Sequence, residues 1–275
     1  MSLPPAPGAR PIADAGWQVP TFVVRFDAGR SRRHCVVIPV LNEGERIRRL
    51  LGRMQALRIA ALCDVIIVDG GSRDGSLEEE ALLAFGVTTL LEKTGPGKLS
   101  AQLRCAYAFA LSAGYTGIVT IDGNDKDDPG AIPAFIAALE GGVDFVQASR
   151  FLPGGVAEHT PWLRDVAIRC LHAPLLALRS GFPWTDTTQG FRAYSARMLR
   201  DPRVAPFRDV FVTYELLAYL SARVPRLGFR CQELPTTRRY PADGKVPTKI
   251  SSVRGNLLVL RILMAACLGR YDPAS

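Results

Sequence analysis

The sequence has 275 residues, of which 48% are apolar and 22% are charged, as is usual for a globular protein that buries a substantial core. Lys and Arg outnumber Asp and Glu by 34 to 26, and the net charge of +8 favours anionic partners such as nucleotides, lipid phosphates or an acidic membrane face. The basic residues are spread along the chain and are not interleaved with aromatic residues, which argues against a nucleic-acid-binding protein.

Residues 1–33 form a Pro- and Ala-rich N-terminal extension that lacks the apolar core of a signal peptide, and we expect it to be partly disordered. The six cysteines are scattered, with no C-x-x-C pair and no cluster with histidines, which disfavours a disulfide framework or a zinc site. This cysteine usage predicts a cytoplasmic location. No stretch reaches the roughly 18 apolar residues of a transmembrane helix.

Short apolar strands alternate with helices over the first half of the chain. We expect buried strands over 35–40, 64–69, 87–91, 117–122 and 144–149. Between them we expect a helix with apolar positions from Ile47 to Leu57, helices near 76–85 and 98–113, and one that begins near Pro129. This alternation predicts an α/β fold with a mostly parallel central sheet and helices on both faces.

The second half of the chain alternates less regularly. We expect helices near 161–179, 195–200 and 211–223, and strands over 189–195 and 228–234. No linker separates the halves, so one domain is expected over 34–250. Residues 251–275 predict a C-terminal helix with an apolar run and basic residues, which packs on the core or on a second subunit of a homo-oligomer, or lies in a membrane interface through 251–270.

Three polar segments follow predicted strands, at 42–43, 69–76 and 122–128. Ligands of open parallel sheets bind at these carboxyl ends of the strands. Asp69 can accept hydrogen bonds from a base or ribose, and Lys98 can meet a phosphate. Asp122 and Asn124 can hold Mg²⁺ or Mn²⁺, which prefer oxygen ligands shared with substrate phosphates. The combination predicts a nucleoside-diphosphate substrate bridged by a metal.

Three segments in this order carry a family resemblance: "VVIPVLNEGERI" (36–47), "IIVDGGSRDGS" (66–76) and "IDGNDKDD" (121–128). They resemble the family 2 glycosyltransferases of the GT-A fold, which use nucleotide sugars and invert the anomeric centre. Gly70 replaces the second Asp of that family's VDDGSxDGT segment, and the third segment stands where the family has its metal-binding Asp-x-Asp. The resemblance implies a nucleotide-sugar pocket formed by Pro39, Asn42, Glu43, Asp69, Lys98, Asp122, Gly123 and Asn124.

The segments "ASRFLPGG" (148–155) and "DTTQGFRAYS" (186–195) narrow the resemblance to the dolichyl-phosphate mannose synthase and polyprenyl-phosphate sugar transferase branch. This branch implies a lipid-phosphate acceptor at the inner face of the membrane. Arg150 and Arg164 match its phosphate-gripping arginines and, with the metal ligand Asp122, form the expected catalytic set. An ionised acceptor of this kind needs no general base.

Alternatives to this assignment follow from other acceptors or activities. A saccharide or other hydroxyl acceptor would require a carboxylate base, for which Asp186 and Glu215 are candidates. Lys245 lies in a basic loop that could close over the phosphates. A nucleotidyltransferase or a degenerate nucleotide-sugar-binding protein would share the sheet and the site.

The metal segment departs from the family pattern. Asn124 replaces the second Asp of the motif, and the stretch up to Pro129 is one residue longer than usual. Asp125 or Asp127 could therefore supply the second ligand beside Asp122. Asp128 is expected to cap the helix that begins at Pro129.

Overall fold

The structure is a computed structural model that describes residues 16–241 and 253–274. The strands are β1 (Phe22–Asp27), β2 (His34–Val40), β3 (Asp64–Asp69), β4 (Val87–Lys93), β5 (Gly117–Thr120), β6 (Phe145–Ser149), β7 (Val156–Glu158), β8 (Arg192–Ser195), β9 (Cys231–Pro235) and β10 (Thr237–Arg239). The helices are α1 (Glu45–Ala56), α2 (Glu79–Ala84), α3 (Leu99–Ser112), α4 (Ile132–Glu140), α5 (Trp162–Ala167), α6 (Ala173–Ser180), α7 (Ala196–Arg200), α8 (Glu215–Arg223) and α9 (Val253–Cys267), with the π-helical turn η3 (Ile168–His172) and the 3₁₀ turns η1 (Ile59–Ala61), η2 (Pro129–Ala131) and η4 (Pro225–Leu227). Lys245 lies outside the described residues.

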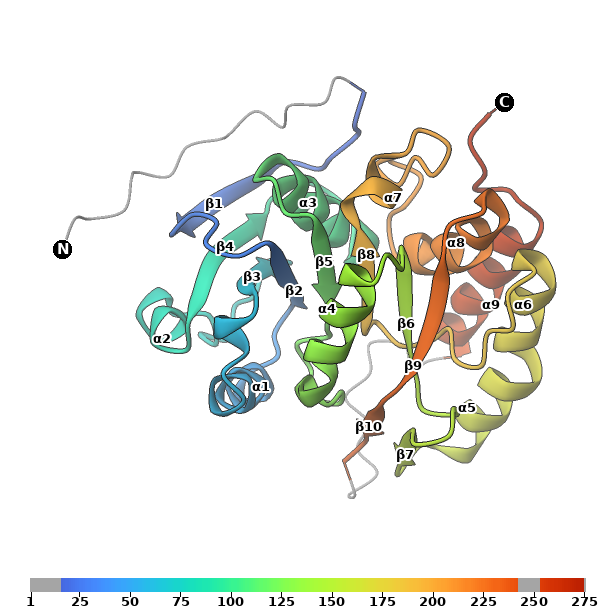
Figure 1. The fold of residues 1–275 in the computed structure, drawn as a ribbon, viewed down its shortest axis with the longest axis horizontal. Coiled ribbons are helices and arrows are strands. Elements are labelled where there is room, and N and C mark those ends of the chain that lie inside the picture. The colour runs from blue at the N-terminus through green and yellow to red at the C-terminus, as the bar shows by residue number, and fades with distance from the viewer. Residues whose placement is uncertain (1–15, 242–252, 275) are drawn as a thin grey trace.

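The central sheet has the strand order β1-β4-β3-β2-β5-β8-β6-β9. The β4-β3-β2-β5 block is parallel, as is the β6–β9 pair, whereas β1 and β8 run antiparallel to their neighbours. Neighbouring residues of β2 point to opposite faces, where Val37 packs with α3 and α8, and Val36 packs with α1 and α4. The predicted α/β fold, with a mostly parallel sheet and helices on both faces, is confirmed (Figure 1).

Some elements differ from the sequence prediction. Residues 22–27, inside the predicted N-terminal extension, form the edge strand β1 on β4. In β1, buried or half-buried residues alternate with exposed ones, and this pattern is a weaker sequence signal for a strand than the continuous apolar runs of the central strands. The helix predicted near 161–179 is divided by η3 into α5 and α6. The short strands β7 and β10 pair in parallel beside the main sheet and were not predicted.

Helix α9 packs one face on the body of the molecule and leaves the other face exposed. Ile262, Leu263 and Ala266 are buried in the same core as α8, and α6, α8 and α9 gather beyond the β9 edge of the sheet (Figure 1). Leu257 and Leu268 are exposed. Among the described residues, no helix combines the length and the apolar content that a membrane span requires.

Candidate active site

The strand order reverses at β2, a position at which a ligand-binding crevice is expected at the carboxyl edge of the sheet. The chain passes from β2 to β3 and β4 on one side and then returns to form β5 on the other side of β2. In open α/β sheets, ligands bind at such a reversal, outside the carboxyl ends of the strands. The β2–β5 ladder ends with the pair Val37 and Thr120, and Pro39 has no N–H with which to continue it. The regular pairing of β2 with β5 therefore stops here, and the loop after β5 continues over the end of β2.

The loops after β2 and β3 are joined by hydrogen bonds. The backbone N–H of Asn42 donates to Ser72 Oγ at 2.9 Å, and the N–H of Arg73 donates to Asn42 Oδ1 at 2.8 Å. Asp69 accepts from both the N–H and the hydroxyl of Ser72, at 2.9 and 2.6 Å. Two of the three predicted strand-end segments therefore form one connected surface, in which Asp69 also stabilises its own turn.

Gln102 explains the glycine that departs from the family pattern at position 70. Its side-chain amide donates to the carbonyls of Val40 and Val68, at 2.9 and 3.1 Å, and so joins the ends of β2 and β3. A Cβ atom at Gly70 would lie 2.9 Å from Gln102 Nε2. A larger residue at position 70 is therefore incompatible with this amide. Nothing in the local sequence indicates Gln102, because its partners lie on other elements.

Two glycines allow the β5 loop to reach the crevice. A Cβ atom at Gly123 would lie 3.1 Å from the carbonyl oxygen of Pro39, so the loop passes directly over the end of β2. A Cβ atom at Gly190 would lie 2.2 Å from Asp122 Oδ1. The Asp122 side chain is 20% exposed, and Asn124 Nδ2 lies 3.5 Å from its Oδ2 atom. Asp122 and Asn124 therefore lie side by side, with the amide nitrogen of Asn124 toward the carboxylate, and Gly190 is a neighbour of Asp122 that sequence analysis missed.

Replacing Gly190 with Ala should displace the Asp122 carboxylate and lower turnover at least about tenfold, since small misplacements of a catalytic group are costly. Steady-state kinetics would measure this loss. The matched control is Gly52→Ala in α1, where the new Cβ would have an ordinary 3.9 Å contact with Phe85 and should keep full activity. Equal activity of both variants would contradict this role of Gly190.

Asp125 and Asp128 face helix α1. Asp125 has a positive φ of 56°, and its carboxylate pairs with Arg53 at 3.0 Å and with Arg49 at 3.4 Å. Asp128 pairs with Arg53 and accepts a hydrogen bond from the N–H of Gly130 at 3.1 Å. The predicted cap is confirmed, although the residues after Pro129 first form the 3₁₀ turn η2.

Asp127 is fully buried and binds Arg238 of β10 through both carboxylate oxygens, at 2.7 and 2.6 Å. Another Arg238 nitrogen lies 3.4 Å from Asp122 Oδ2. Burial by itself would lower the pKa of Arg238, but Asp127 and Asp122 outweigh burial and hold the pKa above its ordinary value. Arg238 therefore remains a cation next to the metal segment. Sequence analysis missed it, because 111 residues separate it from its partner.

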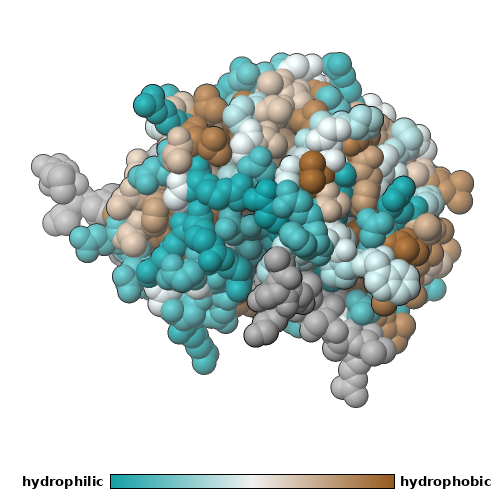
Figure 2. Space-filling view, turned by 90° about the horizontal axis from the view of Figure 1, so that it is seen from below, coloured by the Kyte–Doolittle hydropathy of each residue, from teal (hydrophilic) through white to brown (hydrophobic). Residues whose placement is uncertain are grey.

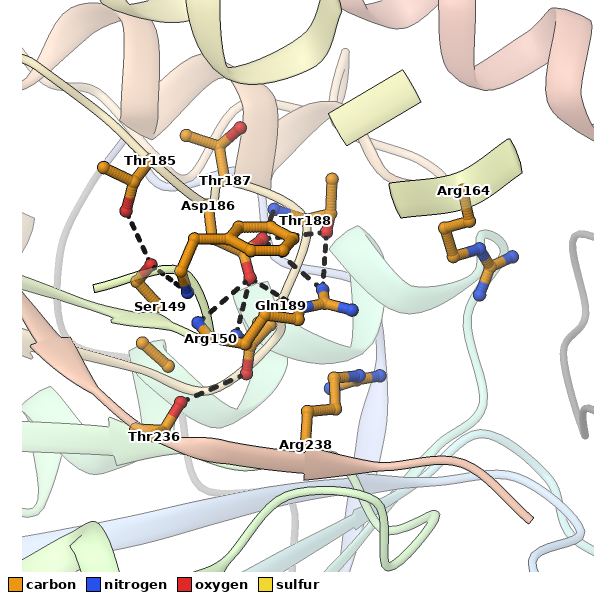
Figure 3. Close-up of polar contacts among 12 residues, drawn as sticks. Ser149, Arg150, Arg164, Thr185, Asp186, Thr187, Thr188, Gln189, Thr236 and Arg238 are labelled. Carbon is orange, nitrogen blue, oxygen red and sulfur yellow. Dashed lines mark hydrogen bonds and ion pairs between the residues drawn. The ribbon is translucent and has the colours of Figure 1, made fainter. Parts of the chain in front are cut away.

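Arg150, at the end of β6, forms a buried ion pair with Asp186 (Figure 3). Arg150 Nε donates to Asp186 Oδ2 at 2.7 Å, and Thr188 and Gln189 also donate to this carboxylate. Burial by itself would raise the pKa of Asp186, but Arg150 and the two hydrogen bonds outweigh burial and hold the pKa below its ordinary value. Asp186 is thus an ionised, fully engaged carboxylate.

Glu215 and Lys98 lie at the starts of two helices. Both Glu215 oxygens accept hydrogen bonds from Thr213, and one also accepts from the N–H of Val212, so this carboxylate supports the turn before α8. Lys98 is exposed immediately before α3. The Glu43 carboxylate is paired with Arg46 at 2.8 Å.

Tyr240, which follows β10, is surrounded by basic side chains. Arg164 of α5 donates to its hydroxyl at 3.1 Å, Lys126 Nζ lies 5.1 Å from its ring centroid, and Arg238 lies 5.8 Å from the centroid. We call Lys126, Arg150, Arg164 and Arg238 the cationic cluster. Within the described residues, the buried nitrogens Arg150 Nη1 and Arg238 Nε have no hydrogen-bond partner. Buried donors without partners are costly, so these atoms suit an anionic ligand.

A divalent metal at Asp122 would need oxygen donors from the protein. Residues 16–241 and 253–274 contain no group of three or more His, Cys, Asp or Glu side chains that could hold an ion alone. Mg²⁺ and Mn²⁺ sites of nucleotide enzymes need only one or two protein oxygens, because the substrate phosphates and water complete the shell. The Asp122 carboxylate fits this requirement as one oxygen donor, whereas Asn124 turns its amide nitrogen toward Asp122, and its Oδ1 atom accepts a hydrogen bond from the N–H of Lys126 at 3.2 Å.

Comparisons with known proteins agree with this geometry. The sequence model described as "Glycosyl transferase family 2" matches residues 35–202. Polyprenol monophosphomannose synthase of Mycolicibacterium smegmatis is 26% identical over 210 residues, which are 75% of this chain and 77% of that protein. Undecaprenyl-phosphate mannosyltransferase of Micrococcus luteus is 28% identical over 207 residues, which are 74% of this chain and 83% of that protein.

Among solved structures, this chain is similar to glucosyl-3-phosphoglycerate synthase of Mycobacterium tuberculosis in complex with Mn²⁺, UDP and glucosyl-3-phosphoglycerate. The two superpose with a TM-score of 0.58 at 21% identity, over 90% of this chain and 82% of that chain. This likeness confirms the GT-A fold. The family model covers well over half of the chain, from β2 to just beyond α7, and includes the crevice, Asp122 and Arg150. The chain therefore belongs to glycosyl transferase family 2.

Proposed function

We propose that this glycosyltransferase transfers a sugar, with inversion, from a nucleotide-diphosphate sugar to a polyprenyl phosphate. The observation that carries the proposal is the cationic cluster, in which the buried donors Arg150 Nη1 and Arg238 Nε have no partner among the described residues, and in which Arg238 reaches within 3.4 Å of Asp122. Two relatives with matching sequences over most of their length are named for polyprenol or undecaprenyl phosphate mannosylation, which supports the same acceptor class.

The donor half of the site is proposed at the crevice between β2 and β5. Asp69 and the joined loops after β2 and β3 would hold the nucleoside, with Pro39, Asn42 and Glu43 forming the wall and Lys98 near the phosphates. Asp122 and Asn124 would hold Mg²⁺ or Mn²⁺, which, when bound, supplies positive charge for the leaving diphosphate. The carboxylate of Asp125 is held by two arginines of α1, whereas the Asn124 oxygen is held by one backbone N–H, so we retain Asn124 as the second ligand, with its amide turned toward the ion.

The acceptor half is proposed at the cationic cluster. Arg150 and Arg164 would orient the phosphate of the acceptor so that one of its oxygens attacks the anomeric carbon in line. A phosphate monoester is largely ionised at neutral pH and needs no base. Asp186 and Glu215, whose oxygens are engaged by neighbouring donors, suit this scheme better than a hydroxyl acceptor.

An apolar surface adjoins the proposed acceptor site. Exposed apolar side chains on α5, α6 and α9 include Trp162, Leu163, Leu178, Leu257 and Leu268. Hydrophobic residues gather at the right of the molecule, the side of α5 and α6 (Figure 2). Arg164 lies on α5 itself, so this surface could meet a membrane that carries the lipid acceptor. Sedimentation with anionic lipid vesicles tests the contact, and protein that remains in the supernatant would contradict it.

The proposed function is tested by offering one nucleotide sugar to three acceptors. The donor is first selected by a thermal-shift screen with Mn²⁺, because a ligand of the native state raises its melting temperature. Undecaprenyl phosphate should accept the sugar, whereas undecaprenol and a saccharide should not. Transfer to undecaprenol or to the saccharide but not to undecaprenyl phosphate would refute the proposal.

Replacing Arg164 with Gln should raise the KM for undecaprenyl phosphate about 10- to 100-fold, because a charge-assisted hydrogen bond to phosphate is lost. The KM for the nucleotide sugar should change little. The matched control is Arg203→Gln, since Arg203 is exposed and pairs only locally with Asp201. A rise in the KM for the nucleotide sugar, without a rise in the KM for undecaprenyl phosphate, would contradict the assignment of Arg164 to the acceptor half.

A further inference from the structure

The hydroxyl of Tyr240 lies where an anion would bind in the cationic cluster. Tyr240 is 3% exposed, and Arg164 Nη1 donates to its hydroxyl at 3.1 Å. The guanidinium carbons of Arg164 and Arg238 both lie 5.8 Å from the ring centroid, and Lys126 Nζ lies at 5.1 Å. These three cations come from α5, from β10 and from the segment between β5 and α4. Elements that are far apart in the sequence thus direct positive charge toward one phenol.

Carboxylates engage two of the three arginines around Tyr240. Asp186 engages Arg150, and Asp127 engages Arg238, whose other face lies near Asp122. For Arg164, the hydrogen-bond partner in the described part of the chain is the Tyr240 hydroxyl. The Glu158 carboxylate, on the strand that pairs with β10, is engaged by Arg239. Among residues 16–241 and 253–274, Arg164 therefore has a phenol, and no carboxylate, as its partner.

The nearby arginines change the acidity of the phenol. Burial by itself would raise the pKa of Tyr240, but Arg238, Arg150 and Arg164, together with the hydrogen bond from Arg164, outweigh burial and bring the pKa to about 7. Tyrosine ordinarily ionises near pH 10. A phenol that ionises near neutrality can supply the negative charge that the cluster otherwise takes from a ligand.

We propose that Tyr240 is a positioning residue that regulates the acceptor-phosphate site: its neutral hydroxyl holds Arg164 in place for the phosphate, and its phenolate competes with the phosphate for the same cations. This inference rests on the proposed phosphate acceptor. It differs from the proposed function in that it assigns the pH range in which the acceptor binds, and it gives Tyr240 no part in bond making.

The direction of the pH effect follows from the charge of each form. As the pH rises through about 7, the phenol loses a proton and adds one negative charge among the cations. The affinity for a phosphate dianion then falls, since like charges oppose each other at short range. The acceptor phosphate loses its second proton near pH 6, and this added negative charge raises its affinity for the wild type and for every variant alike. The ratio between wild type and Tyr240→Phe therefore isolates the phenol.

Spectroscopic titration of the intact protein tests the inference without requiring turnover. The near-ultraviolet absorbance of tyrosinate should show one group that titrates near pH 7 in the wild type and is absent in Tyr240→Phe. Saturating inorganic phosphate should move this titration to higher pH, because bound phosphate removes the cations from the phenolate. A wild type with no tyrosine titrating near neutrality, or a titration that phosphate leaves unchanged, would overturn the inference.

Kinetics with undecaprenyl phosphate supply the second readout. Below pH 7, Tyr240→Phe should raise the acceptor KM about tenfold, because Arg164 loses its hydrogen bond. Above pH 7 the two KM values should converge as the wild type loses affinity. The matched control is Tyr271→Phe, which removes a hydroxyl near the C-terminal end and should follow the wild type at every pH.

The results separate this inference from the proposed function. A phosphate-sensitive titration of Tyr240, in a protein that transfers sugar to no polyprenyl phosphate, would support the anion site and refute the acceptor. Transfer to undecaprenyl phosphate with a constant KM ratio between Tyr240→Phe and wild type across neutrality would support the acceptor and refute the role of Tyr240.

Discussion

Replacing Asp122 with Asn should lower sugar transfer about 100- to 1,000-fold, the range observed when one electrostatic contact to a transition state is removed. The amide keeps the shape of the carboxylate but lacks the negative charge that a divalent ion requires. The fold should persist, because Arg238 keeps its bidentate pair with Asp127. Steady-state kinetics with Mn²⁺ measure the loss, and chelation by EDTA should reproduce it in the wild type.

Two further variants show whether the loss is specific to Asp122. Asp201→Asn alters a half-buried carboxylate that pairs locally with the exposed Arg203, and it should retain wild-type activity. Asp125→Asn breaks ion pairs with α1 and should lower activity only a few-fold. A loss at position 125 equal to that at position 122 would instead assign Asp125 as the second metal ligand. Full activity of the wild type in EDTA would refute the metal site.

Replacing Asp186 with Asn should destabilise the fold by about 3–5 kcal/mol, because Arg150 then carries a buried charge without its partner. Urea unfolding at neutral pH measures the change, and Asp201→Asn again serves as the control, because its partner Arg203 is exposed. Acceptor binding should weaken as well, since Arg150 loses the carboxylate that fixes its orientation. A variant of unchanged stability that fails only in turnover would identify Asp186 as a general base and favour a hydroxyl acceptor.

The same ion pair predicts how stability depends on pH. The pKa of Asp186 is lower in the folded protein than its ordinary value of 3.8, so the unfolded chain binds more protons in acid. The contribution of Asp186 is complete above pH about 5 and decreases as the pH falls through the folded pKa. The stability difference between wild type and Asp186→Asn should therefore shrink in acid. A difference that grows as the pH falls would contradict this assignment.

The local sequence was sufficient to predict the strands of the central sheet. Runs such as 35–40 and 64–69 are continuously apolar, and such runs fit strands that are buried on both faces. The polar segments after them could be assigned to the carboxyl edge, because strand direction in a β/α alternation fixes that edge. Edge strand β1 was missed because half-buried strands carry a weaker pattern.

The partners of the charged residues could not be predicted in this way. In the segment 122–128, the sequence offers four carboxylates as candidate metal ligands. In the folded protein, Asp127 pairs with Arg238, and Asp125 pairs with two arginines of α1. Asp186 likewise forms an ion pair with Arg150, and Tyr240 accepts a hydrogen bond from Arg164. Periodicity records which side of an element is buried, and it contains no information about which distant charge will face it.

The α/β fold and the three polar strand ends could be predicted from the sequence, and Asp122 could be proposed as a metal ligand, because each depends on apolar runs and short local segments. Only the tertiary structure decided that Gly190 leaves room for Asp122, that Gln102 requires a glycine at position 70, and that four basic side chains converge on Tyr240. These features depend on contacts between side chains far apart in the chain, and close packing fixes such contacts only when the elements assemble.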